Sequence, residues 1–237
     1  MFIVIKKSGI ISFAVCLFVS AFIFFYLNRA ESVFVETSPS FSGSIVLDAG
    51  HGDIDGGAVG KNGTVEKDIN LAVCKKTKAY LEKCGMSVIV TRDDDLSLTD
   101  KNGKSTRQIK RDDLSFRRKM RDGSGAGIFV SIHMNKFPDE KYSGAQVFYA
   151  SSPEKSKILG ETIQKNLIDI LDKENTRAAK RAENSIYILK DSPIPAVIVE
   201  CGFLSNEKEE ALLKTESYQN KIAWAIFSGI KEYMKTN

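Results

Sequence analysis

Short apolar runs alternate with longer stretches of mixed character along most of the chain, and this pattern predicts the order of strands and helices. Runs rich in Val, Ile and Phe, each about the length of one strand, lie at residues 44–49, 86–91, 127–132, 145–150, 185–190 and 196–201. Most of them are continuous rather than alternating. Such runs are typical of strands in a sheet that is covered on both faces.

The stretches between these runs carry apolar residues at helical spacing. Residues 65–85 show this spacing, and Gly85 is predicted to cap the C-terminus of that helix. The same pattern predicts helices at 153–174 and 216–235. Strands that alternate with helices are typical of an α/β fold. We therefore expect a single domain at residues 43–237, with a central, mainly parallel or mixed sheet of about six strands flanked by helices.

The N-terminal part of the chain has a different character. Residues 8–27 are apolar and uncharged, and Lys6 and Lys7 stand in front of them. A helix of this length, at about 1.5 Å per residue, spans the roughly 30 Å of bilayer hydrocarbon. Residues 1–28 are thus predicted to be an uncleaved membrane anchor or a cleaved signal peptide, and residues 29–42 a short tether. The basic flank favours a cytoplasmic N-terminus, so we expect the domain to be extracytoplasmic, membrane-anchored or secreted.

Composition and charge support a folded domain and give no sign of nucleic-acid binding. The 237 residues are 43% hydrophobic and 27% charged, with a formal net charge of only +4. Residues 101–121 are dense in Lys and Arg, but Phe116 is the one aromatic residue among them. A surface that stacks single-stranded bases needs more aromatic residues than this. The basic stretch is therefore interpreted as a solvated helix face, and no nucleic-acid partner is expected.

Three of the predicted strands end in polar residues that could bind a metal ion or take part in catalysis. The chain has only two histidines; His51 follows the first run and His133 follows the third, while Glu200 lies at the end of the last run. Ligands of open α/β sheets bind at the carboxyl ends of strands. If these strands are parallel, the three side chains lie on one edge of the sheet. Two histidines with a carboxylate are also a typical set of zinc ligands that leaves a position open for water.

The third zinc ligand has several candidates in the sequence. Asp53, Asp55 and Glu66 all follow the first histidine closely. The two aspartates lie in a glycine-rich loop and are equally well explained as residues of a solvated turn. Glu66 follows Thr64 at the predicted start of a helix, where the N-terminus favours a carboxylate. The residues alone favour Glu66 without excluding the other two.

Three blocks of sequence resemble the zinc-dependent N-acetylmuramoyl-L-alanine amidases of bacterial cell walls, the type 3 amidases. These blocks are IVLDAGHGDIDGGAVGKNGTVEKDINLAV, GIFVSIHMN and PAVIVECGFLSN, at residues 45–73, 127–135 and 195–206. The resemblance implies that His51, Glu66 and His133 bind Zn²⁺, which selects Glu66 as the third ligand. It also implies that Glu200 is the catalytic residue of the amide hydrolysis.

Three further residues are candidates for a supporting role. Asp48 and Asn135 flank the two histidines and are predicted to orient them or to position substrate, although a turn-forming role explains them as well. Arg117 resembles an arginine that the family often carries, which implies a structural role.

A short chain with an N-terminal anchor and no wall-binding repeats looks most like the sporulation- and germination-specific cortex amidases. That resemblance implies cleavage of spore-cortex peptidoglycan between N-acetylmuramic acid and L-alanine, which enables muramic-δ-lactam formation. It places the domain between the forespore membranes or on the wall side of the membrane. Because no wall-binding repeat is recognisable in the sequence, we also expect a protein partner that localises or activates the domain. The alternatives are a zinc peptidase that acts on the stem peptide and a non-catalytic peptidoglycan-binding module.

Overall fold

The computed structural model describes residues 18–20 and 43–236. The chain divides into two compact units, Met1–Ser38 and Pro39–Asn237. In the first unit the described residues, 18–20, are helical. The predicted anchor and tether therefore lie almost entirely outside the described residues. Among the helices that the structure does describe, none is both long enough and apolar enough to cross a membrane.

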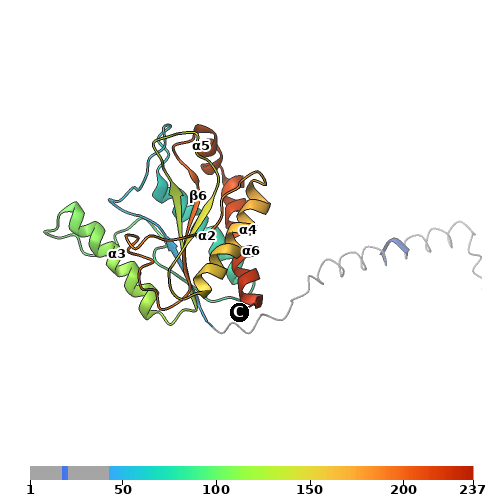
Figure 1. Ribbon diagram of the computed structural model, residues 1–237, viewed down its shortest axis with the longest axis horizontal. Helices are drawn as coiled ribbons and strands as arrows, with labels where there is room; N and C mark the ends of the chain where they lie inside the picture. Colours follow the sequence, from blue (N-terminus) through green and yellow to red (C-terminus); the bar gives the residue numbers. More distant parts are fainter. Residues whose placement is uncertain (1–17, 21–42, 237) are drawn as a thin grey trace, which may run out of the picture. The chain divides into compact units, whose positions relative to one another are not determined.

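The larger unit is built on a six-stranded mixed sheet (Figure 1). The strands are β1 (Ile45–Ala49), β2 (Val88–Val90), β3 (Ile128–Asn135), β4 (Gln146–Tyr149), β5 (Lys180–Arg181) and β6 (Ala196–Phe203). Their order across the sheet is β2-β1-β3-β6-β4-β5. The strands β2, β1, β3 and β6 are parallel, whereas β4 is antiparallel to β6. The α/β architecture and the mixed sheet predicted from the sequence are thus confirmed.

One predicted strand is wrong. Residues 185–190 form successive turns, in which the Ile186 amide donates to Glu183 O and the Leu189 amide donates to Ile186 O. The edge strand of the sheet is β5 instead. Ile188 and Leu189 are nevertheless buried against the sheet. The apolar run is therefore buried as a series of turns. Its backbone groups form hydrogen bonds with nearby residues of the same segment and not with a neighbouring strand.

Helices cover both faces of the sheet (Figure 1). They are α2 (Glu66–Lys83), α3 (Thr106–Gly123), α4 (Lys155–Leu171), α5 (Glu207–Leu213) and α6 (Glu216–Thr236). The helices α2, α4 and α6 pack on one another and on one face, and α3 lies on the opposite side. The helices predicted at 65–85, 153–174 and 216–235 are confirmed, and Gly85 follows α2 with a φ of 77°.

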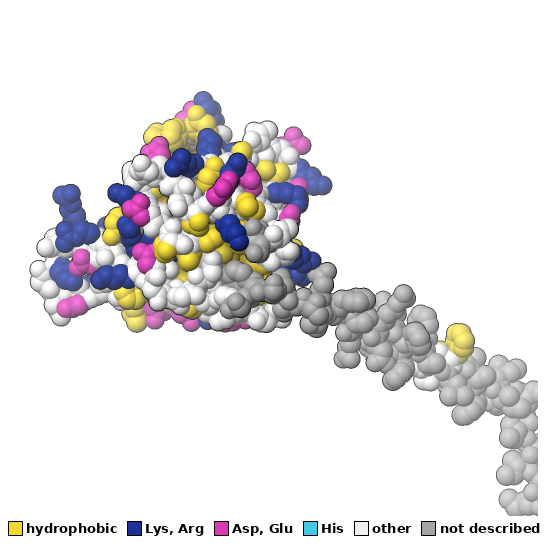
Figure 2. All heavy atoms as spheres, turned by 60° about the horizontal axis from the view of Figure 1, so that its bottom comes forward, with side chains coloured by type: hydrophobic (Ala, Val, Ile, Leu, Met, Phe, Trp, Pro, Cys, Tyr) yellow, Lys and Arg dark blue, Asp and Glu magenta, His cyan; other side chains and the backbone are white. Residues whose placement is uncertain are grey.

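The basic stretch of the sequence is α3. Arg107, Lys110 and Arg111 are exposed on it, and Lys and Arg side chains gather at this end of the molecule in Figure 2. Its buried residues are Ile109, Arg117 and Arg121, so the predicted solvated basic face is confirmed for the exposed side of the helix.

Successive side chains of β3 alternate between the large core on one face of the sheet and the candidate site residues on the other. In β3, Ile128, Val130 and Ile132 lie in the large core under α2, α4 and α6. Ser131 and His133 therefore point to the opposite face, where α3 lies. In the sheet, β2 lies on one side of β1, whereas β3 and β6 lie on its other side. The strand order therefore reverses between β1 and β3, at their carboxyl ends. Ligands of open α/β sheets bind at such points.

Candidate metal centre and active site

Two histidines and a glutamate converge at this edge of the sheet. His51 follows β1, Glu66 begins α2 and His133 lies near the end of β3. One ligand atom from each lies within 4.8 Å of the others. The Glu66 Oε1 atom is 3.2 Å from His51 Nε2 and 3.1 Å from His133 Nδ1. Two imidazole nitrogens and a carboxylate oxygen that point at one another form a group suited to bind a metal ion such as zinc.

Glu66 is held rigidly by backbone amides. Its Oε2 accepts a hydrogen bond of 2.7 Å from the Ala58 amide, and its Oε1 accepts one of 3.1 Å from the Met134 amide. Burial disfavours its charge, but hydrogen bonds to His133 and His51 outweigh burial and hold the pKa of Glu66 far below its usual range. The helix N-cap is Val65, which makes no side-chain cap, so Thr64 does not cap the helix as its position suggested.

The turn that carries His51 is strained and is fastened by two buried arginines. His51 has a φ of 60°, which non-glycine residues rarely adopt. Arg117 donates to the carbonyl oxygens of Ala49 and His51, and Arg92 donates to those of Ala49 and Gly50. A Cβ atom at Gly50 would lie 2.2 Å from the His133 ring, so only glycine allows this close approach. The two arginines thus fix the backbone on which the first histidine stands.

Asp55 orients the ring of His51. Its Oδ2 lies 2.9 Å from His51 Nδ1, and its Oδ1 accepts a hydrogen bond of 2.7 Å from Lys110 of α3. Burial disfavours the imidazolium, but the hydrogen bonds to Asp55 and Glu66 raise the pKa of His51 to about 9. With Nδ1 engaged by Asp55, Nε2 faces Glu66. Histidines that bind metals are usually oriented by a carboxylate in this way.

We expect Asp55→Asn to weaken zinc binding by about 10- to 100-fold, because the carboxylate that orients His51 and makes it more basic is lost. Competition with a chelating zinc indicator measures the affinity. Asp53→Asn is the matched control: Asp53 lies in the same loop and pairs with Lys101, 2.9 Å away. Equal losses in both variants would show that Asp55 supports the loop and does not act through the histidine.

His133 is oriented by a chain of polar groups on the face opposite the large core. Its Nε2 lies 3.1 Å from Ser131 Oγ, which donates a hydrogen bond of 2.5 Å to Asp48 Oδ2. Burial opposes ionisation of Asp48, but Arg117, Ser131 and Thr91 together lower its pKa. Asp48 therefore reaches His133 through Ser131. Ser131 was missed at the sequence level, although it is the one hydroxyl residue in an otherwise apolar run.

Arg117 is buried and forms an ion pair with Asp48 as well as one of 2.6 Å with Asp113. We expect Arg117→Met to lower the free energy of unfolding by about 3–5 kcal/mol, because Asp48 is left charged and buried without its partner. Chemical denaturation measures this change. Arg111→Met, on the exposed side of the same helix, should stay within about 0.5 kcal/mol of the unsubstituted protein. A small effect of Arg117→Met would contradict a structural role for the buried pair.

Glu200 lies beside the metal-binding group. It pairs with His133 across β3 and β6, so both side chains stand on the same face of the sheet. Its Oε2 is buried and has no hydrogen-bond partner among the described residues. Burial raises the pKa of Glu200 to about 7, with Glu66 adding to the shift and the two histidines opposing it. A carboxylate oxygen that is buried without a partner, next to a group that can bind a metal, suits proton transfer.

Asn135 contrasts with the other candidates. It ends β3, and its backbone oxygen accepts a hydrogen bond of 2.8 Å from Leu204. Its side chain makes no hydrogen bond to any residue in the described ranges, so its role in orienting histidines or substrate stays a prediction.

An α/β fold with a His–Glu–His group at a reversal of strand order, and an unpaired buried glutamate next to it, defines the class of metal-dependent hydrolases. Residues 45–232 match the N-acetylmuramoyl-L-alanine amidase family, and the chain belongs to this family. It is therefore an enzyme that hydrolyses the amide bond between N-acetylmuramic acid and L-alanine in peptidoglycan.

Named relatives agree with this assignment. The chain is 36% identical to the germination-specific N-acetylmuramoyl-L-alanine amidase of Bacillus subtilis over 96% of its own length and 95% of the relative's. It is 49% identical to the CwlD amidase of Clostridioides difficile, solved in complex with the GerS lipoprotein, with a TM-score of 0.80 over 82% of this chain and 100% of that one. The catalytic domain of CwlV from Bacillus (Paenibacillus) polymyxa is 32% identical, with a TM-score of 0.68 over 82% and 99% of the two chains.

Proposed function

We propose that the chain is a zinc-dependent amidase of spore-cortex peptidoglycan, in which His51, Glu66 and His133 hold the metal and Glu200 is the catalytic residue. The observation that carries this proposal is the His–Glu–His group, whose ligand atoms lie within 4.8 Å of one another beside the unpaired Oε2 of Glu200. Two neutral imidazoles and one carboxylate suit Zn²⁺ and leave a position open for substrate or water.

The residues divide the work of the reaction among them. A zinc ion, when bound, supplies Lewis acidity that lowers the pKa of water to about 7 and stabilises negative charge on the carbonyl oxygen. Glu200 accepts the proton of the attacking water at Oε2, the buried oxygen without a partner, and returns it to the leaving nitrogen of L-alanine. Asp55 and the Ser131–Asp48 pair keep His51 and His133 in their orientations throughout.

The spore-cortex role is supported by the named relatives. The germination-specific amidase matches this chain over nearly the whole length of both proteins. Removal of stem peptides from muramic acid then leaves the lactyl group free, which is the step required before a muramic-δ-lactam forms. Since peptidoglycan lies outside the cytoplasmic membrane, we place the domain on that side, between the forespore membranes or facing the wall.

The partner and the anchor are also proposals. The CwlD amidase was solved with a lipoprotein, and its similarity to this chain supports a protein partner that localises the enzyme or promotes zinc binding. The anchor proposed for residues 8–27 falls outside the described residues except at 18–20. Zinc occupancy of the purified chain tests the partner: full occupancy and full activity without any other protein would contradict it.

Digestion of purified cortex peptidoglycan tests the reaction itself. The full chain is incubated with and without added zinc, and the products are analysed by mass spectrometry. We expect zinc-dependent release of stem peptides with a free N-terminal L-alanine. Cleavage between two stem residues would instead identify a zinc peptidase, and binding without cleavage would identify a non-catalytic module.

A further inference from the structure

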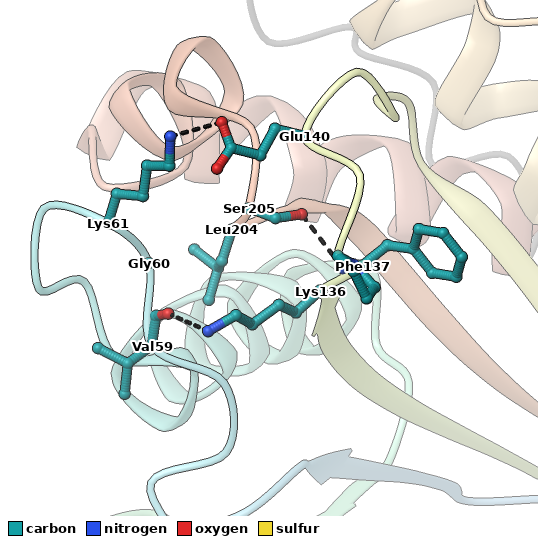
Figure 3. Close-up of a pocket in the computed structure, with 9 residues that line it drawn as sticks. Val59, Gly60, Lys61, Lys136, Phe137, Glu140, Leu204 and Ser205 are labelled. Atoms are coloured by element: carbon teal, nitrogen blue, oxygen red, sulfur yellow. Dashed lines mark hydrogen bonds and ion pairs between the residues drawn. The ribbon is translucent and has the colours of Figure 1, made fainter.

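A cavity of about 250 Å³ is shown in Figure 3. The loops that line it follow the carboxyl ends of β3 and β6 or precede α2, so it lies at the same edge of the sheet as the metal-binding group. Three segments line it: the loop before α2, the loop after β3 and the turn after β6. The residues on these walls are Val59, Gly60, Lys61, Lys136, Phe137, Pro138, Glu140, Leu204 and Ser205. None of them belongs to the metal-binding group or its supports.

The walls of the cavity continue from segments that hold the metal-binding group. Its first wall begins one residue after Ala58, whose amide donates to Glu66, 2.7 Å away. Its second wall begins two residues after Met134, whose amide donates to the same carboxylate over 3.1 Å. Leu204 in the third wall follows Glu200 by four residues. The cavity therefore lies in loops that continue from the residues holding Glu66 and from the strand that carries Glu200.

The walls are fastened to one another, so the cavity is already formed in the free protein. Lys61 on the first wall pairs with Glu140 on the second at 2.5 Å. The Phe137 amide donates to Ser205 Oγ at 3.1 Å, and the Asn206 side chain donates to the Glu140 carbonyl oxygen at 3.0 Å. A preformed site loses little conformational freedom when a ligand binds, which favours affinity.

Lys136 is a charged group on the wall of this cavity that pairs with no carboxylate among the described residues. Figure 3 shows its side chain reaching toward Val59, whose carbonyl oxygen accepts a hydrogen bond of 2.9 Å from Nζ. This partner is neutral, and Lys136 makes no ion pair with any described residue. Lys61, by contrast, pairs with Glu140 and also lies 3.9 Å from Glu207. An ammonium group has three donors, so Lys136 retains donors for an anion, while Phe137 and Leu204 supply apolar walls.

We propose that this cavity binds the stem peptide of the substrate, and that Lys136 recognises a carboxylate of that peptide. The inference rests on the proposed function. The lactyl carboxyl of muramic acid is consumed in the scissile amide, and the neighbouring sugars are N-acetylated, so the glycan side of the bond is uncharged. Carboxylates begin on the peptide side, and a cavity with one free positive charge is complementary to that side.

The test compares two ligands that differ only in charge: N-acetylmuramoyl-L-alanyl-D-glutamate, and the same compound with both glutamate carboxylates converted to amides. Their dissociation constants are measured by calorimetry on the zinc-loaded full chain carrying Glu200→Gln, which leaves them uncleaved. We expect about tenfold tighter binding of the carboxylate compound, and Lys136→Gln to reduce this preference to near one. Lys136→Arg should retain most of it.

Lys141→Gln is the matched control, because Lys141 lies on the same loop but lines no part of this cavity. It should keep the tenfold preference. No preference in the parent protein, or a preference that survives Lys136→Gln, would overturn the assignment. This outcome can be told apart from failure of the proposed function. If the enzyme releases stem peptides but does not distinguish the two ligands, only the proposed subsite is rejected.

Discussion

Glu200→Gln is expected to lower kcat/KM on peptidoglycan by about a thousandfold or more while zinc content stays unchanged. General acid–base catalysis by one positioned group typically contributes 10²- to 10⁴-fold, and an amide neither accepts nor returns the proton. The substitution keeps the size of the side chain and removes a carboxyl whose Oε2 has no partner among the described residues. The fold therefore loses no hydrogen bond of that oxygen, and the change should act on turnover and not on stability.

Glu209→Gln separates this effect from the general cost of changing a buried glutamate. Glu209 is also buried, but its oxygens accept hydrogen bonds from the amides of Gly144 and Phe203, at 3.0 and 2.8 Å. Its amide variant should lose about 1–3 kcal/mol of the free energy of unfolding, because one amide donor loses its acceptor. Its kcat/KM should stay within about threefold of the unsubstituted enzyme. Full activity of Glu200→Gln would contradict the catalytic role. If the variant lost zinc together with activity, Glu200 would be a zinc ligand or a residue that positions one.

The residues that could be predicted are those whose position depends on local pattern. His51, His133 and Glu200 each follow or end an apolar run, and parallel strands bring such ends to one edge of a sheet. Glu66 was favoured because it opens a helix, and it does begin α2. The strand predicted at 185–190 is wrong because an apolar run indicates burial and not a particular secondary structure. In this segment the buried residues lie in turns.

The supporting residues depend on pairings that are distant in sequence. Asp55, in the loop after β1, meets Lys110 on α3, and Ser131 meets Asp48 on the neighbouring strand. Neither pairing has a local signature, since Asp55 in a glycine-rich loop is equally typical of a solvated turn. Arg92 was not singled out at all, because a single arginine after a short strand does not reveal that it fastens the backbone of Ala49 and Gly50. Such contacts follow from the sheet order, which the sequence pattern leaves open.

Glu66→Gln should have the second large effect, and it should act through the metal. The substitution removes the charge of the one carboxylate in the His–Glu–His group, so zinc affinity should fall by at least about a thousandfold, and activity with it. It also places an amide NH₂ group against the Ala58 or Met134 amide, both of which now donate to the carboxylate. A buried donor that loses its acceptor costs about 1–3 kcal/mol, so this variant should be less stable than the parent protein even without metal.

Asp68→Asn is the matched control, because Asp68 is the other acidic residue in the first turn of α2 but is exposed. It removes the same charge from the same helix terminus and should leave zinc affinity within about twofold, since an exposed charge there contributes only a few tenths of a kcal/mol. Zinc titration and unfolding of the metal-free proteins separate the two contributions of Glu66. A Glu66→Gln variant that is destabilised but binds zinc normally would leave the carboxylate as a purely structural link between the loop at Ala58 and β3, and the metal would need a different third ligand.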